Sequence, residues 1–317
     1  MPIKADESKN SYKTFIHYSL SAPTKDLLKL LNIGCVSLAN NHVFDCKMPG
    51  LKATVRTLDE LGVFHAGAGW LPEHVSPVII SEDNYRIAFL AYVDKSTNPE
   101  TEHFPELLIN YFDKEKVISD IRTIRDQVDT VIVSIHWGND YSNFYTKKQQ
   151  ESARMIIHSG ADIIMGHHPH TLQPYEIYDG KLIFYSLGQL CFGDSLWEGK
   201  LRALKKKTKT GMIASVSIKK GSFRPHFIPT FEEEGNYLSI LPLDLESKLN
   251  RLKFINEKIH KYKTIAFIAR IKETALDRFN DYFFGYYRNF FVQLLGLLIN
   301  IKKFNYLVRD YKNYKKD

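Results

Sequence analysis

Short apolar runs typical of strands alternate with longer segments of helical apolar spacing along the first 230 residues of the chain. The clearest run is residues 130–135, TVIVSI, because β-branched side chains favour strands. Alternation of this kind predicts a layered α/β (α+β) domain. Further strands are expected at residues 35–39, 76–80, 86–92 and 162–165 and on both sides of the turns at 179–180 and 220–221, with helices at 23–31, 49–61, 114–125 and 147–159.

The pattern changes near residue 244, where helical periodicity with many aromatic residues and lysines begins and no proline follows. We therefore expect two parts: a main domain at residues 1–235 and a basic, aromatic-rich helical appendage at residues 244–317. The net charge of +7 belongs to the appendage, because residues 245–317 hold 16 Lys and Arg against seven Asp and Glu. The positive balance therefore says nothing about the substrate of the main domain.

Composition places the chain among globular proteins, since 44% of residues are hydrophobic and 25% are charged, which excludes a disordered or collagen-like chain. The first residues are polar and form no apolar signal segment, so the chain as written is expected in the cytoplasm. An apolar stretch in the appendage, residues 290–299, is too short to span a bilayer. It suits either a peripheral position on a membrane surface or packing against the main domain or another subunit.

Three polar clusters follow predicted strands: Asn40-Asn41-His42, His136-Trp137-Gly138 and the segment 166–170, GHHPH. Ligand sites of α/β folds collect at the carboxyl ends of strands, where loops converge. A single histidine at a strand end is more often structural, but three such clusters in one chain favour a metal site. Imidazole and amide donors suit a divalent ion such as Mn²⁺, Zn²⁺ or Fe²⁺.

Several motifs also resemble those of one known family. The segments SLANNHVFD, LDELGVFHAGAG, HWGNDY, GADIIMGHHPH and QPYEIYDGKLIFYSLGQ occur in this order within residues 37–189. They are similar to the CapA family of poly-γ-glutamate capsule biosynthesis proteins, which belongs to the metallophosphoesterase superfamily, and the likeness covers roughly residues 10–230. The resemblance implies a calcineurin-like β-sandwich flanked by helices, with a two-metal hydrolase site at the strand ends.

The resemblance also implies roles for individual residues. Asn41, His136 and His168 would bind one metal ion, and His170 would bind the other. His42 would be catalytic, because it would contact the leaving oxygen of a phosphoester or donate a proton to it. Asp45 would orient His42 through the second ring nitrogen.

Two family motifs that supply carboxylate ligands, Gly-Asp and Asn-Leu-Glu, have no counterpart among the 39 residues before Asn40. Gln189 also stands where the family has Asn in SLGNF. We therefore expect a chain truncated at its N-terminus, which holds one metal ion rather than two and has weak activity. A truncated chain would also have lost any signal or anchor on that segment. The alternative is a non-catalytic capsule-assembly or polymer-binding component with a degenerate metal site.

The expected partner is an anionic capsule polymer or its precursor. A basic loop that includes Lys205, Lys206 and Lys207 would attract such a polymer, although an ordinary solvated loop is the favoured explanation of these charges. The helical appendage would contact a membrane surface or the capsule machinery. Nothing in the sequence resembles a nucleic-acid-binding motif.

Overall fold

The computed structural model describes most of the first 261 residues, namely 2–4, 18–97, 104–190, 192, 195–197, 200–202, 208–219, 221–233, 238–240 and 245–261. The chain divides into two compact units, Met1–Glu257 and Lys258–Asp317, and the fold below is that of the first unit. The predicted appendage at 244–317 lies mostly outside the described residues, as do Lys205, Lys206 and Lys207. Within the described ranges, every helix is too short or too polar to cross a bilayer.

A six-stranded sheet forms the centre of the first unit, with the strand order β4-β5-β7-β8-β10-β9. The inner strands β5, β7, β8 and β10 run parallel, and the edge strands β4 and β9 are antiparallel to their neighbours. The strands are β4 (Val78–Glu82), β5 (Tyr85–Val93), β7 (Thr130–His136), β8 (Ile163–His167), β9 (Tyr175–Tyr178) and β10 (Lys181–Phe184). Each was expected from its apolar run, and β5 with β4 forms the predicted hairpin.

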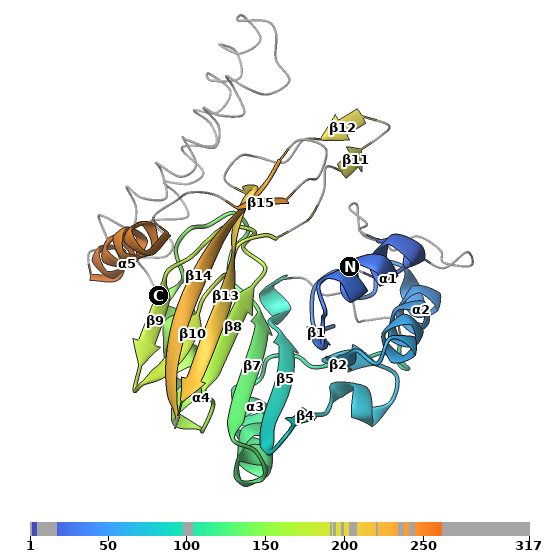
Figure 1. Cartoon of the computed structure of the whole chain (residues 1–317), viewed down its shortest axis with the longest axis horizontal. Helices are drawn as coiled ribbons and strands as arrows, with labels where there is room; N and C mark the ends of the chain where they lie inside the picture. The colour runs from blue at the N-terminus through green and yellow to red at the C-terminus, as the bar shows by residue number, and fades with distance from the viewer. Residues whose placement is uncertain are drawn as a thin grey trace, which may run out of the picture. The chain divides into compact units, whose positions relative to one another are not determined.

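Two helices, α3 (Lys114–Ile124) and α4 (Lys147–His158), cover one face of this sheet (Figure 1). Both begin where a side chain caps the first turn: Asp113 accepts from the backbone of Lys116, and Thr146 forms a reciprocal capping box with Gln149. Their apolar stripes pack on the sheet in one core that includes Ile121, Ile156, Val133 and Trp137. The predicted flanking helices are therefore confirmed.

A second sheet covers part of the opposite face. It contains β13 (Thr210–Lys219), β14 (Ser222–Glu232) and β15 (Leu238–Ile240), paired antiparallel. Met212 and Phe223 of this sheet pack against Ile163 and Phe184 of the central sheet. Helix α5 (Leu245–Lys261) adds Leu245 and Leu249 to the same core. The first unit thus has the expected sandwich of two sheets with helices outside.

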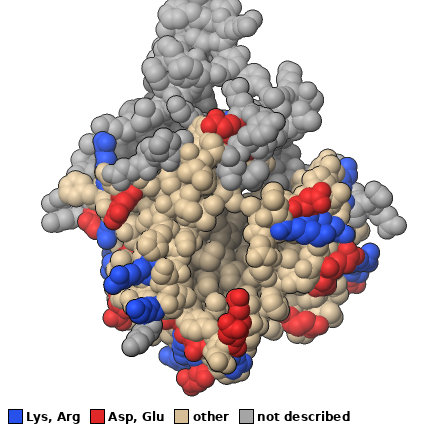
Figure 2. Space-filling model, viewed as in Figure 1, with Lys and Arg blue, Asp and Glu red and all other residues tan. Residues whose placement is uncertain are grey.

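The remainder of that face is covered by an N-terminal lobe, which contains α1 (Ser21–Leu30), β1 (Cys35–Ser37), α2 (Lys47–Glu60) and β2 (Phe64–Ala66). Strands β1 and β2 are parallel, and Ala39, just after β1, and Ala66, the last residue of β2, pack on Phe89 and Ala91 of β5. Figure 2, which is drawn from the same side as Figure 1, shows a hollow near its middle. The walls of this hollow are formed by residues other than Lys, Arg, Asp and Glu.

Short elements complete the described part of the first unit: β3 (Ala68–Gly69), β6 (Leu108–Ile109), β11 (Ser195–Trp197), β12 (Lys200–Arg202) and the 3-10 turns η1 (Pro72–Val75), η2 (Lys95–Thr97) and η3 (Arg125–Gln127). Gly67, between β2 and β3, has a φ of 107°, and an added Cβ would lie 2.6 Å from that of Ala39. Only glycine fits this close approach.

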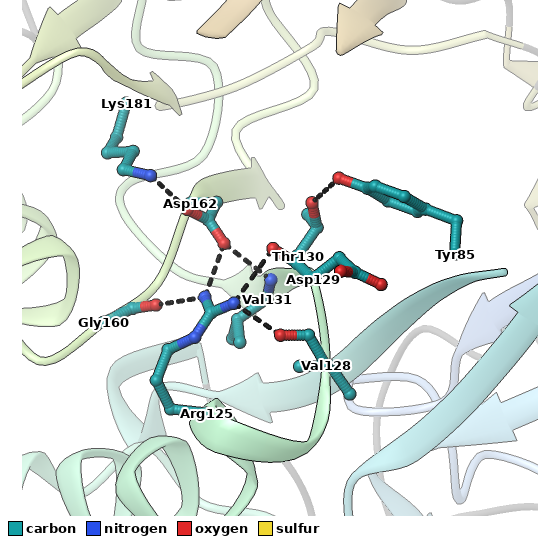
Figure 3. Close-up of polar contacts among 9 residues, drawn as sticks. All are labelled: Tyr85, Arg125, Val128, Asp129, Thr130, Val131, Gly160, Asp162 and Lys181. Atoms are coloured by element: carbon teal, nitrogen blue, oxygen red, sulfur yellow. Dashed lines mark hydrogen bonds and ion pairs between the residues drawn. The ribbon is translucent and has the colours of Figure 1, made fainter. Parts of the chain in front are cut away.

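An ion-pair cluster fixes the amino ends of the central strands (Figure 3). Asp162, directly before β8, accepts a hydrogen bond of 2.6 Å from Arg125 and one of 2.8 Å from the backbone of Val131 in β7. Lys181 of β10 binds its other carboxylate oxygen. Arg125 also donates to the carbonyl of Gly160 at 2.9 Å. This Asp162 cluster joins η3, β7, the start of β8 and β10 at the end of the sheet opposite the histidines.

Candidate metal centre

The loop after β1 and the carboxyl ends of β7 and β8 bring three predicted ligands together. Nε2 of His136 lies 2.9 Å from Oδ1 of Asn41 and 3.0 Å from Nδ1 of His168. An ion bound at about 2.1 Å holds neighbouring ligand atoms roughly 3.0–3.4 Å apart. Both distances from His136 are close to the spacing of two ligands of one ion, although the three residues come from positions up to 127 residues apart in the chain.

His170 lies beside this trio. Its ring centre is 6.2 Å from that of His168, and its Nδ1 is 2.9 Å from Oε1 of Gln189. Tyr141 stacks on its ring at 5.9 Å, and Phe192 meets it edge-on at 5.3 Å. Gln189, the residue that departs from the family pattern, therefore holds one nitrogen of His170 and leaves Nε2 for a ligand.

His42 and Asp45 are also in contact, with 2.7 Å between Nδ1 and the carboxylate. Asp45 is fully buried, and the backbone of His42 donates to the Asn40 side chain at 2.9 Å. His42 is close enough to the trio that its charge would lower the pKa of His136 and His168. The contact expected from the resemblance is present.

Burial favours the neutral form of three histidines of the centre, His136, His168 and His170. Burial, then repulsion from His167 and His168, lowers the pKa of His136 well below its usual value. Burial lowers the pKa of His168 to about 4, although Asp140 opposes this shift. Burial likewise lowers the pKa of His170. Neutral imidazole is the form that binds a metal ion, so the centre needs no proton loss near neutral pH.

His167 is a residue that the sequence reasoning did not assign. Its Nδ1 is 2.7 Å from Nδ1 of His136, and its Nε2 is 2.9 Å from Oγ of Ser134. If an ion were held at Nε2 of His136, the proton of His136 would lie on Nδ1 and would be donated to Nδ1 of His167. His167 then donates to Ser134, so this pair orients the ligand. The sequence feature that could have indicated this role is Ser134, which lies two residues before His136 on the same strand and therefore on the same face.

Carboxylates are scarce around the centre. Oδ1 of Asp140 is 3.4 Å from Nε2 of His168, and Asp140 is exposed. Among the residues that the structure describes, no group of three or more His, Cys, Asp or Glu is arranged to hold a metal ion. The trio therefore provides two imidazoles and one amide oxygen, a neutral set that fits one borderline divalent ion better than two.

Backbone strain also concentrates here. His168, His170 and Tyr141 have φ values of 104°, 57° and 60°, a region that residues other than glycine rarely adopt. Each such residue costs of order 1–3 kcal/mol and persists where the surrounding structure requires it. Three such residues lie around one histidine cluster.

Comparison with known proteins places most of the chain in one family. Residues 2–194 match the family model described as "Bacterial capsule synthesis protein PGA_cap". The capsule biosynthesis protein CapA of Bacillus anthracis is 31% identical over 208 residues, covering 62% of this chain and 49% of the relative. The PGA biosynthesis protein CapA of Bacillus subtilis (strain 168) is 34% identical over 186 residues, covering 57% and 48%.

A putative 5'-nucleotidase from Staphylococcus aureus, solved in complex with alpha-ketoglutarate, aligns with a TM-score of 0.47 and 13% identity, over 74% of this chain and 44% of that one.

The family match spans more than half of the chain. The chain therefore belongs to the family of bacterial capsule synthesis proteins described as PGA_cap. It spans about half the length of the two CapA relatives.

Proposed function

We propose that this chain carries the metal-dependent hydrolase site of a CapA-like protein that acts in the synthesis or attachment of a poly-γ-glutamate capsule polymer. The observation that carries the proposal is the meeting of Asn41 and His168 at Nε2 of His136, at 2.9 and 3.0 Å. Family membership supplies the capsule context, since two relatives are named for capsule and PGA biosynthesis.

Asn41, His136 and His168 would hold a divalent ion, which would supply Lewis-acid polarisation of a phosphoester or a related bond. The chain's own residues supply the proton and orient the metal ligand. His42, held by Asp45 through Nδ1, donates a proton toward the leaving oxygen. His167 keeps the lone pair of His136 directed at the centre.

A second candidate is a non-catalytic component that binds the polymer or assembles the capsule machinery. The neutral donor set favours it, because without carboxylates the charge of the ion is not compensated and its retention is weakened. Under either proposal the partner is an anionic capsule polymer or its precursor. A peripheral position on the membrane, with contacts through the C-terminal residues, belongs to the same proposal.

The two candidates separate in one set of measurements on the full chain. Metal content and Mn²⁺ or Zn²⁺ titration calorimetry give stoichiometry, and a chromogenic phosphodiester gives turnover. We expect one ion per chain, lost in His168→Ala and retained in the control His226→Ala on β14. Turnover that is lost when either His168 or His42 is replaced by alanine supports the hydrolase. Metal binding without turnover supports the non-catalytic component, and failure to bind any divalent ion refutes the metal centre.

A further inference from the structure

A buried carboxylate on the second sheet lies behind the histidines of the metal centre. Glu232, the last residue of β14, is 1% exposed. Its Oε2 accepts a hydrogen bond of 3.1 Å from the backbone N–H of Phe192 and a longer one of 3.5 Å from Nε2 of Gln189. Gln189 is also buried, at 7% exposed. The family match ends at residue 194, so Glu232 lies outside the segment that defines the family.

The second sheet also fixes the backbone that carries Gln189. Gly188 forms an antiparallel backbone bridge with Gly211 of β13, the strand that pairs with β14. A Cβ added to Gly211 would lie 2.2 Å from the carbonyl oxygen of Gln189, so this close approach requires glycine. The segment before Gln189 is therefore bound to the same sheet as Glu232, and the two side chains face each other from a common support.

The contact with Glu232 determines how the amide of Gln189 is oriented. An ionised carboxylate accepts hydrogen bonds and cannot donate them, so the part of the amide that faces it is the NH₂ group. A reversed amide would place its oxygen against the carboxylate oxygen, with no proton between them. The amide oxygen of Gln189 therefore points away from Glu232, and it lies 2.9 Å from Nδ1 of His170.

This orientation selects one tautomer of His170. Burial lowers the pKa of His170, which favours the neutral ring with a proton on one nitrogen only. Because Oε1 of Gln189 can only accept, that proton lies on Nδ1 and the lone pair lies on Nε2. Tyr141 stacks on the ring at 5.9 Å between ring centres, and Phe192 meets it nearly at a right angle at 5.3 Å. These contacts oppose a rotation of the ring that would exchange the positions of its nitrogens.

We propose that Glu232 is a positioning residue of the metal centre, which acts through Gln189 to hold the proton of His170 on Nδ1 and keep the lone pair of Nε2 available to a ligand. A neutral imidazole can carry its proton on either nitrogen, so without these contacts part of the molecules would present an N–H at Nε2. Glu232 thus acts on the centre without touching a ligand atom. The use of this lone pair by a metal ion rests on the proposed function, but the position of the proton does not.

Long-range ¹H–¹⁵N correlation spectra of the metal-free full chain distinguish a protonated ring nitrogen from a bare one. They are recorded at about pH 8, above the ordinary pKa of histidine. His170→Gln identifies the signals of His170, which should show the proton on Nδ1. Glu232→Leu removes the acceptor and should shift the tautomer ratio toward Nε2 about tenfold, as expected for a lost hydrogen bond to a charged group. Glu232→Gln keeps an acceptor oxygen opposite Phe192 and should retain the wild-type ratio.

Two further variants complete the test. Gln189→Met keeps the length of the side chain but removes the acceptor of His170, so it should give the same shift and serves if Glu232→Leu does not fold. Glu233→Leu, at the exposed neighbouring position, is the matched control and should leave the ratio unchanged. A wild-type His170 with its proton on Nε2, or a folded Glu232→Leu protein with the wild-type ratio, overturns the proposal.

Titration of the wild-type chain with Mn²⁺ or Zn²⁺ separates this proposal from the proposed function. A chain with the proton on Nδ1 that binds neither ion refutes the metal centre and leaves the positioning by Glu232 intact. A chain that binds an ion while the metal-free His170 carries its proton on Nε2 supports the metal centre and refutes the positioning.

Discussion

Replacing Asp162 with alanine should destabilise the main unit by about 3–5 kcal/mol, the usual cost of breaking a buried ion pair by removing one partner. The Asp162 carboxylate is 5% exposed and joins Arg125 of η3, the backbone of Val131 in β7 and Lys181 of β10. The substitution leaves the Val131 amide without its acceptor, which alone costs about 1–3 kcal/mol. Arg125 keeps its bond to the carbonyl of Gly160, so the lower half of the range is expected.

Urea unfolding followed by far-ultraviolet circular dichroism measures this change. Lys181→Gln is the matched control, because the Lys181 side chain is 31% exposed and such pairs contribute roughly 1 kcal/mol or less. A double-mutant cycle of Arg125→Ala with Asp162→Ala should give a coupling energy of about 1–3 kcal/mol. An Asp162→Ala protein within 1 kcal/mol of wild type, or additive single changes, would show that the cluster is incidental.

Three further outcomes follow from the site and its surroundings. His167→Ala should weaken metal binding about 10- to 100-fold with little change in secondary structure, measured by calorimetry, and His167→Asn should restore part of it if orientation is its role. The folded-state pKa of His168, lowered to about 4, means that the unfolded chain binds more protons between about pH 4 and 6.5. Stability should therefore rise with pH through that window and be flat above it, and unfolding curves that fall there would contradict the neutral histidine. A chain ending at Glu257 should unfold cooperatively. A chain ending at residue 244 should have a free energy of unfolding lower by about 2–5 kcal/mol, because it lacks the buried side chains of Leu245 and Leu249. Equal stability of the two truncated chains would show that α5 does not complete the core.

The layers of the main unit follow from local sequence. The run at residues 130–135 and the capping pair Thr146 and Gln149 encode their elements directly, because propensity, cap and apolar period agree there. The meeting of Asn41, His136 and His168 was also predictable, since each follows or ends a strand. Sequence analysis missed contacts that depend on how strands pair, because such contacts leave no mark on either segment alone.

His167 is an example of a contact set by pairing. It lies opposite His136 only because β7 and β8 pair with His136 against His167. The short strands β2 and β3 were missed because two or three residues carry too little periodicity for a strand signal. Asp140 lies in a loop, so its position near His168 depended on the tertiary fold.

That pairing has a consequence for how the protein reaches its native state. A slip of one residue between β7 and β8 would turn every side chain of one strand to the opposite face. His136 would then point toward the helices, away from Asn41 and His168. The three ligand atoms would no longer lie together, so they could not bind one ion. An ion present during refolding would bind only chains with the native alignment and draw the population toward it by mass action. Metal binding would thus favour the native alignment of these two strands. The fraction of chains with a bound ion would measure how many molecules have paired these strands correctly.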